Sequence, residues 1–275
     1  MNNRKIILLY LILSIYVNVH ASFVRTAGKQ IVDPQGNNLI LRGLGTGNWM
    51  LQEGYMMQSA DIAPTEWQFR KKLIETMGVE RTNQFYTRWH DNHFRKIDVD
   101  SMARWGFNCV RPALHYKIFT LPIEDEPISG QHTWLEDGFV RLDSLVAWCA
   151  ANEMYVMFDM HGAPGGQGKD AAISDYDASK PSLWESELNK QKFIALWRKI
   201  AERYANNPWV AGYDLLNETN WTFPEGNNSQ MMDLYKRTTR AIREVDNNHM
   251  VVIGGNWFSN DFSGLTPPEV SFRRN

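Results

Sequence analysis

The chain has 275 residues, of which 43% are hydrophobic and 22% are charged. This composition excludes an intrinsically disordered chain and suffices for a large core, so we expect one globular domain. The formal net charge is -2 and no basic cluster stands out, which argues against a nucleic-acid partner.

Residues 1–21 have the pattern of a secretory signal peptide. Arg4 and Lys5 precede an apolar stretch over residues 6–17, and Val19 and Ala21 form a small-residue cleavage site. An uncleaved membrane anchor is the alternative, but about twelve apolar residues are too few to cross a bilayer core of about 30 Å as a helix. We therefore expect a mature chain of residues 22–275 without a stable membrane span, exported to the periplasm, the cell surface or the medium.

The mature chain begins with a predicted hairpin and then alternates strands with helices. Turn-forming residues at 27–29 and 33–38 mark the hairpin within residues 23–44. Short apolar runs predict five core strands, at residues 39–44, 107–112, 154–160, 210–216 and 250–254. Between the later strands, apolar residues recur at helical spacing over residues 94–105, 139–149, 193–204 and 231–245. This alternation predicts a parallel sheet covered by helices.

An open, doubly wound sheet is the competing layout. Gly43, Gly45 and Gly47 follow the first predicted strand, but about 45 residues without a regular pattern come next, so no helix is expected to begin at that turn. A phosphate-binding turn of the dinucleotide-binding type is therefore not expected.

Polar and aromatic residues at the strand ends favour a barrel instead. They are Asn48 and Trp49, Arg111, His161, Asn217 and Glu218, and Asn256 and Trp257. Parallel (β/α)8 barrels carry their chemistry at the carboxyl ends of the strands. Five strands are present where a closed barrel has eight, so we expect an incomplete TIM barrel, from a truncated gene or a shifted reading frame, with exposed edges on its first and last strands.

Two residue types leave alternatives open. Cys109 and Cys149 each lie in an apolar run, which favours buried thiols, although one disulfide is compatible with export. The 11 tryptophans are partly core residues, but those after strand ends, including Trp184, Trp221 and Trp257, are also suited to stack on sugar rings.

Four segments in register carry a resemblance to a known family. They are residues 41–54, residues 106–112 (Gly-Phe-Asn-Cys-Val-Arg-Pro), residues 159–165 (Asp-Met-His-Gly-Ala-Pro-Gly) and residues 215–218 (Leu-Leu-Asn-Glu). In them the chain resembles the N-terminal two-thirds of a glycoside hydrolase family 5 enzyme of the cellulase and exo-β-glucanase type. The resemblance implies a truncated catalytic barrel over residues 22–275 and a retaining mechanism with two carboxyl groups.

The resemblance also implies roles for individual residues. Glu218 matches the proton donor that acts as acid and base, and Asn217 matches the residue that binds the sugar 2-hydroxyl, although it could instead cap a helix. Arg111 matches an arginine beside the nucleophile, with a surface salt bridge as the alternative, and His161 matches a sugar-binding histidine. Asn48, Trp49, Asn256 and Trp257 are expected to contact substrate.

The family's nucleophile at strand seven has no counterpart in this sequence. Asp159 and Asp214 are interpreted as structural strand residues. Asp159 and His161 could suggest a metal site, but further ligand spacing is lacking, so neither a metal nor a cofactor is expected.

The predicted function is that of an exported retaining β-glycosidase acting on a β-glucan or related polysaccharide. The 275-residue chain itself is expected to be inactive for lack of the nucleophile. The alternatives are a non-catalytic carbohydrate-binding fragment and a chain that does not fold stably.

Overall fold

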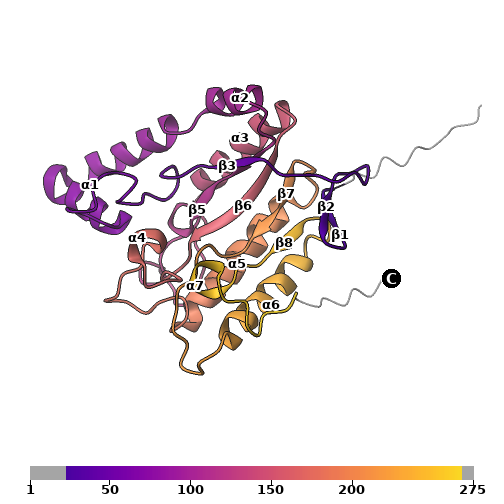
Figure 1. The fold of residues 1–275 in the computed structure, drawn as a ribbon. Coiled ribbons are helices and arrows are strands. Elements are labelled where there is room, and N and C mark those ends of the chain that lie inside the picture. Colours follow the sequence, from indigo (N-terminus) through magenta and orange to yellow (C-terminus); the bar gives the residue numbers. More distant parts are fainter. Residues whose placement is uncertain (1–22, 268–275) are drawn as a thin grey trace, which may run out of the picture.

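A computed structural model describes residues 23–267 of the chain (Figure 1), so the predicted signal peptide at 1–21 lies outside the described residues. In chain order the elements are β1 (Arg25–Ala27), β2 (Gln30–Val32), β3 (Gly43–Gly45), α1 (Glu66–Asn92), α2 (Lys96–Arg104), β4 (Cys109–Arg111), β5 (Ala113–His115), η1 (Tyr116–Ile118), α3 (Glu136–Ala151), β6 (Tyr155–Gly162), α4 (Ala171–Ser174), α5 (Glu187–Tyr204), β7 (Val210–Asp214), α6 (Ser229–Arg243), β8 (Met250–Val252) and α7 (Asn256–Ser259).

The strands after the N-terminal hairpin form one parallel sheet. β1 and β2 pair antiparallel, while the sheet has the order β3-β4-β6-β7-β8, with β5 also paired to β6. Pro112 lies between β4 and β5. Because proline has no N–H to donate, it interrupts the hydrogen-bond ladder, and the two pieces together form one barrel strand. Within residues 23–267 the structure therefore confirms the predicted hairpin and five strands of an incomplete barrel.

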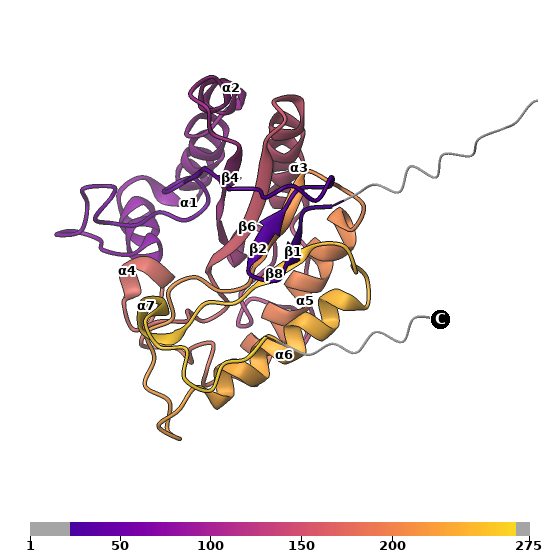
Figure 2. The ribbon, with the colours of Figure 1, turned by 45° about the vertical axis from the view of Figure 1, so that its right-hand side comes forward.

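The first and last strands of this sheet are its edges, as the sequence predicted. β3 has all three residues exposed, and β8 has a neighbour only on the side of β7 among the described residues. Figure 2 shows the sheet from a second direction, with α3, α5 and α6 lying against one face of it.

Apolar side chains fill both faces of the sheet. The larger cluster lies between the sheet and its helices and includes Phe139 of α3 and Trp197 of α5. A smaller cluster lies on the inner face, where Cys109, Met157 and Ala211 pack with Val24 ahead of the hairpin. Cores of this kind supply the main stabilisation of the fold.

The two cysteines are free and buried, which confirms the expectation of buried thiols. Burial raises the pKa of Cys109 to about 11 and that of Cys149 to about 12, so both thiols stay protonated at neutral pH.

One fold prediction was wrong, because residues 66–92 form the long helix α1 rather than irregular chain. Thr65 caps its start by accepting a hydrogen bond from the backbone N–H of Gln68 at 3.3 Å. Gly78, at φ 83°, divides the helix into two arms, which project beyond the sheet in Figure 1. Only Thr82 and Tyr86 of α1 are buried, so the helix lacks the apolar stripe that reveals a helix in sequence.

No helix within residues 23–267 combines the length and the apolar composition that a bilayer crossing requires.

Candidate active site

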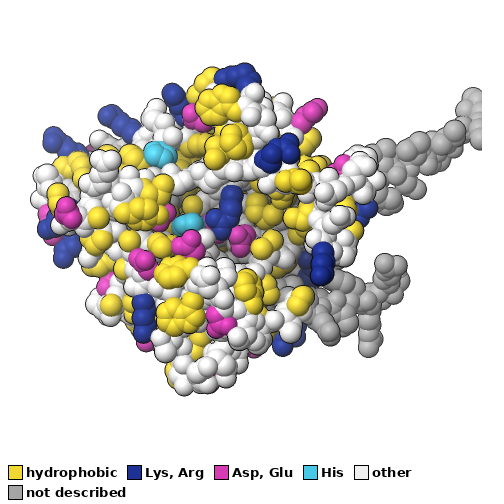
Figure 3. All heavy atoms as spheres, in the orientation of Figure 1, with side chains coloured by type: hydrophobic (Ala, Val, Ile, Leu, Met, Phe, Trp, Pro, Cys, Tyr) yellow, Lys and Arg dark blue, Asp and Glu magenta, His cyan; other side chains and the backbone are white. Residues whose placement is uncertain are grey.

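The predicted site residues meet at the carboxyl ends of the parallel strands. Residues two apart on a strand share a face, so Arg111 follows Cys109 and Asp159 follows Met157 on the inner face of the sheet. The register pairs Gly45 with Arg111 and Asp159 with Asp214 on neighbouring strands. Polar side chains thus form a layer directly above the inner apolar cluster. Figure 3 shows cationic, anionic and histidine side chains close together near the middle of this face.

Arg111 is the centre of this layer. Its Nη1 lies 2.9 Å from Oδ2 of Asp159, its Nη2 donates to Oδ2 of Asp214 at 2.8 Å, and Nη2 also donates to Oδ1 of Asn217 at 3.1 Å. Burial alone would lower the pKa of Arg111, but the charges of Asp159 and Asp214 outweigh it and raise that pKa. The arginine side chain is therefore a fixed cation that ties β4 to β6 and β7.

His161 forms the second part of the layer. Its Nδ1 lies 2.6 Å from Oδ2 of Asp159, and its Nε2 lies 3.5 Å from Oε1 of Glu53. Although burial alone would lower the pKa of His161, these two carboxylates raise it to about 9. The imidazolium can donate one proton to each carboxylate. The amide Nδ2 of Asn217 lies 3.1 Å from Nε2, a contact that is a hydrogen bond only while Nε2 is unprotonated.

Asn217 is buried, and Glu218 beside it is half-buried. Glu218 has a φ of 39°, in the left-handed region that a non-glycine residue enters at a cost of about 1–3 kcal/mol. Such outliers cluster at functional sites. Among residues 23–267, none donates a hydrogen bond to the Glu218 side chain within bonding distance, so its carboxyl group is available to a ligand.

The negative charge of Glu218 affects the pKa values of neighbouring groups. It contributes to the raised pKa of Arg111, after burial and the two aspartates. Burial raises the pKa of Tyr55 to about 12, and the carboxylates of Glu53 and Glu218 add to this shift. The predicted proton donor therefore lies in one electrostatic cluster with Arg111, as expected from the sequence.

A short turn after β6 holds the two strand ends together. Gln167 is fully buried, and its Nε2 donates to the backbone carbonyls of His161 at 2.7 Å and Asn217 at 2.9 Å. Its Oε1 accepts from the N–H of Ala163 at 3.1 Å. The role of Gln167 was not predicted from the sequence.

Asn48 and Trp49 lie in the loop after β3 and are both buried. Oδ1 of Asn48 accepts from the backbone N–H of Glu53 at 2.9 Å, which fixes the loop that carries Glu53. Trp49 is 2% exposed, packs on Phe94 and donates its indole N–H to the carbonyl of His90. The Trp49 side chain is thus a core residue with no face open to a sugar, which corrects its predicted role as a substrate contact.

Asn256 and Trp257 open α7 after β8. The Asn256 amide is 3% exposed and is bonded to the backbone N–H and carbonyl of Trp221 and to Asn228, so it fixes loops around the site. Trp257 is 45% exposed and, with Phe258, has a left-handed backbone. Trp257 therefore has an open ring face, and its contact with substrate stays a prediction.

Asp159 and Asp214 belong to the site, which the sequence did not predict. They were interpreted as structural strand residues, yet both bind Arg111. Burial and the nearby Asp159 charge raise the pKa of Asp214 to about 6, against the opposing effect of Arg111. Their spacing was the available signal, because Asp159 lies two residues before His161 and thus on the same strand face.

Within residues 23–267 no group of three or more histidine, cysteine, aspartate or glutamate side chains is arranged to hold a metal ion.

Comparisons with known proteins agree with this arrangement. Residues 71–273 match the family model for cellulase, glycosyl hydrolase family 5. A β-xylosidase of Phanerodontia chrysosporium is 32% identical over 242 residues, which are 88% of this chain and 48% of the relative. Endoglucanase C of Acetivibrio thermocellus is 30% identical over 174 residues, or 63% of this chain and 46% of the relative. The chain thus spans about half the length of these curated relatives.

Solved structures show the same fold. A β-glucanase of Saccharophagus degradans superposes with a TM-score of 0.54 at 19% identity, covering 88% of this chain and 56% of that one. Endoglucanase Cel5A of Thermotoga maritima has a TM-score of 0.51 at 20% identity, covering 66% and 51%. Since the family model matches most of the sequence, this chain belongs to glycoside hydrolase family 5.

Proposed function

We propose that this chain forms the N-terminal part of the catalytic barrel of an exported retaining β-glycosidase, which acts on a β-glucan or a related polysaccharide. The observation that carries the proposal is the hydrogen bond from Arg111 to Asn217, directly beside the unpaired carboxyl of Glu218. It gives the active-site face a fixed cation, a sugar-binding amide and a carboxyl group within one layer.

Glu218 would act first as general acid on the departing glycosidic oxygen and then as general base on water. A retaining mechanism needs a second carboxyl about 5 to 5.5 Å away, which attacks the anomeric carbon. Asp159 and Asp214 are poor candidates for this nucleophile, because both are engaged by Arg111. We therefore infer that the nucleophile is supplied by strands beyond β8, in a protein with the length of the relatives.

The substrate class is inferred from the relatives. Their names specify a β-xylosidase, an endoglucanase and, in Aspergillus fumigatus, a probable glucan 1,3-β-glucosidase that is 24% identical over 269 residues. Two of these names specify a β-linked substrate and two specify a glucan, so the sugar differs among them.

Hydrolysis by a protein extended to complete the barrel tests this proposal. Release of reducing sugar from barley β-glucan, laminarin and xylan should fall by at least about a hundredfold in Glu218→Gln, because general acid catalysis contributes about 10²–10⁴ in rate. Glu225→Gln, at an exposed glutamate of the same loop, is the matched control and should keep full activity. Undiminished hydrolysis by the Glu218 variant would refute the assignment.

The 275-residue chain alone should show no turnover on an aryl β-glucoside. Oligosaccharide binding without product by the extended protein would instead favour the non-catalytic carbohydrate-binding alternative.

We also propose export, supported by the sequence pattern of residues 1–21. Amino-terminal sequencing of the protein recovered outside the cytoplasm should begin at Ser22. An intact Met1 in that material would contradict cleavage.

A further inference from the structure

Two neighbouring hollows lie beside the candidate active site, on the outer side of the loops after β5 and β6. The first, of about 340 Å³, is lined by Trp67, Tyr116, Lys117, Gly166, Asp177 and Lys180, among others. The second, of about 380 Å³, is lined by Trp67, Arg70, Lys71, Ile74, Lys117 and Asp175, among others. The hollows share Trp67, Lys117 and Asp175, so Trp67 borders both, and we call them together the Trp67 groove.

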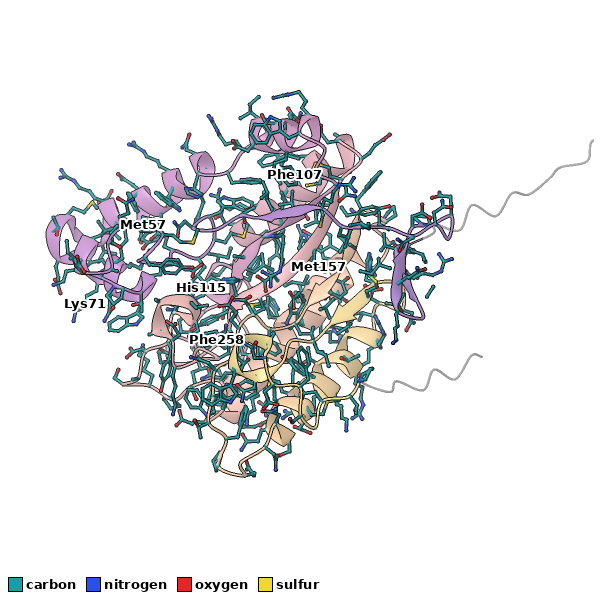
Figure 4. The ribbon with its side chains drawn as sticks, in the orientation of Figure 1. Met57, Lys71, Phe107, His115, Met157 and Phe258 are labelled. Carbon is teal, nitrogen blue, oxygen red and sulfur yellow. The ribbon has the colours of Figure 1, made fainter. Side chains whose placement is uncertain are left out.

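The walls of the groove come from the first turns of α1, the segment after β5, the loop after β6 and the first turn of α5. In Figure 4, His115 marks the end of β5 between α1 and α4, and Lys71 marks the outer part of α1.

Both the backbone and the indole ring of Trp67 are held by hydrogen bonds. Its backbone N–H donates to Oδ1 of Asp175 at 2.8 Å, and its indole N–H donates to the carbonyl of Tyr176 at 3.3 Å. The Asp175 side chain is 1% exposed and also binds Lys117 at 2.7 Å and lies 3.4 Å from Nε2 of His115. Because the ring is already ordered, a ligand that stacks on it loses little side-chain entropy on binding.

The charges of the groove are balanced. In the first hollow two lysines accompany three carboxylates, and in the second three cations accompany three carboxylates. Several of these are already paired, including Lys180 with Glu124 at the rim. This balance disfavours a phosphate or a polyanion. An aromatic face surrounded by both donors and acceptors suits a neutral polyhydroxylated ring.

The groove is also linked to the candidate active site. Gly166 lines the first hollow, and Gln167, the next residue, donates to the backbone carbonyls of His161 and Asn217. A Cβ at Gly166 would lie 2.8 Å from Tyr176 Cα, so the turn between the two regions packs tightly. The loop after β6 thus borders the groove and also supports the site.

We propose that the Trp67 groove is a secondary binding site for a β-linked oligosaccharide, distinct from the site around Glu218. The ligand class rests on the proposed function, while the position and the character of the groove come from its own residues. The groove holds a second segment or branch of the polysaccharide while the main chain lies over the strand ends.

The test is a titration of the whole 275-residue chain with cellotetraose and laminaritetraose, followed by indole 1H–15N NMR signals. We expect the Trp67 indole signal to shift saturably with a β-linked tetrasaccharide and not with maltotetraose, its α-linked counterpart. Binding to the variants is measured by isothermal titration calorimetry, because Trp67→Ala lacks the reporting indole. Trp67→Ala should weaken the binding about tenfold, and Lys180→Ala, at an exposed side chain whose loss leaves the fold intact, about threefold. Trp105→Ala, which removes a 71% exposed tryptophan outside the groove, should leave it unchanged.

The proposal is overturned if no β-linked tetrasaccharide moves the Trp67 signal, or if both groove variants bind like the wild-type chain. It is also overturned if only the Trp257 signal moves, since binding would then be confined to the strand-end site. The shift of the Trp67 signal does not depend on hydrolysis. A saturable shift of the Trp67 signal with no activity in the extended protein would contradict the proposed function alone. Activity in the extended protein without that shift would contradict the groove proposal alone.

Discussion

The contact between Asp159 and His161 gives the most direct prediction about the electrostatics of the site. Their 2.6 Å contact is buried, with the Asp159 side chain 0% and the His161 side chain 13% exposed. Raising the pKa of His161 from 6.5 to about 9 corresponds to a preference for the imidazolium of roughly 3 kcal/mol. In Asp159→Asn this carboxylate is lost while burial remains, so the pKa of His161 should fall to 6.5 or below, with Glu53 giving only partial compensation.

The sign of the accompanying stability change follows from linkage. A histidine whose pKa is higher in the folded chain stabilises the fold fully below pH 6.5, and this contribution disappears as the pH rises through about 9. In the wild-type chain the free energy of unfolding should therefore decline between these pH values by up to roughly 3 kcal/mol from this group. The Asp159→Asn variant should lack that decline.

A pH titration of the imidazole signals by NMR measures the pKa directly, and urea unfolding at several pH values measures the stability. Asp246→Asn is the matched control, because Asp246 lies 2.6 Å from Nδ1 of His249 in a separate buried pair. That variant should leave the pKa of His161 at about 9. A wild-type pKa near 6.5, or an unchanged pKa in Asp159→Asn, would refute this account of the site.

Three further predictions concern the fold. Lys192→Met should destabilise the chain by about 3–5 kcal/mol in urea unfolding, because it leaves the Glu126 carboxylate, 1% exposed, without its buried partner. An unchanged unfolding midpoint would show that the pair is hydrated. Gly212→Ala should lower the free energy of unfolding by about 1–3 kcal/mol, because the new Cβ would lie 2.6 Å from the carbonyl oxygen of Met250. Equal stability in urea unfolding would mean that β7 and β8 separate easily. Cys149, with 0% exposure and a pKa raised by burial to about 12, should react with a thiol reagent only on unfolding, and rapid labelling of the native chain would contradict its burial.

The sequence predicted the sheet well because buried parallel strands leave strong local signals. Short apolar runs ending in polar residues identified the later four barrel strands, and helical spacing identified the helices between them. The first strand was predicted at residues 39–44, but it forms at Gly43–Gly45, where all three residues are exposed at the sheet edge. The interruption at Pro112 was harder to foresee, since the apolar pattern continues through Ala113 and Leu114 even though proline breaks the ladder. Helix α1 was missed because its polar surface carries no periodic signal.

The site was predicted in part. Arg111, His161 and Asn217 meet as their strand-end positions implied, since neighbouring parallel strands bring equivalent positions together. The roles of Glu53 and Gln167 depend on how loops fold back over the strand ends, and local sequence patterns do not encode such long-range contacts. Trp49 was assigned to the site although it is a core residue, because an aromatic residue after a strand can face the core as readily as the cleft.

The proposed function requires that Glu218 donates the proton to the departing sugar oxygen. The most direct test is the leaving-group dependence of Glu218→Ala in the protein extended to complete the barrel. An aryl β-glycoside with a highly acidic phenol needs no proton donor, so the variant should form its glycosyl-enzyme nearly as fast as the wild type, while cleavage of a β-glucan or an alkyl β-glycoside falls by about 10²–10⁴. An equal loss for all leaving groups, or no loss for any, would contradict the assignment of Glu218 as the acid.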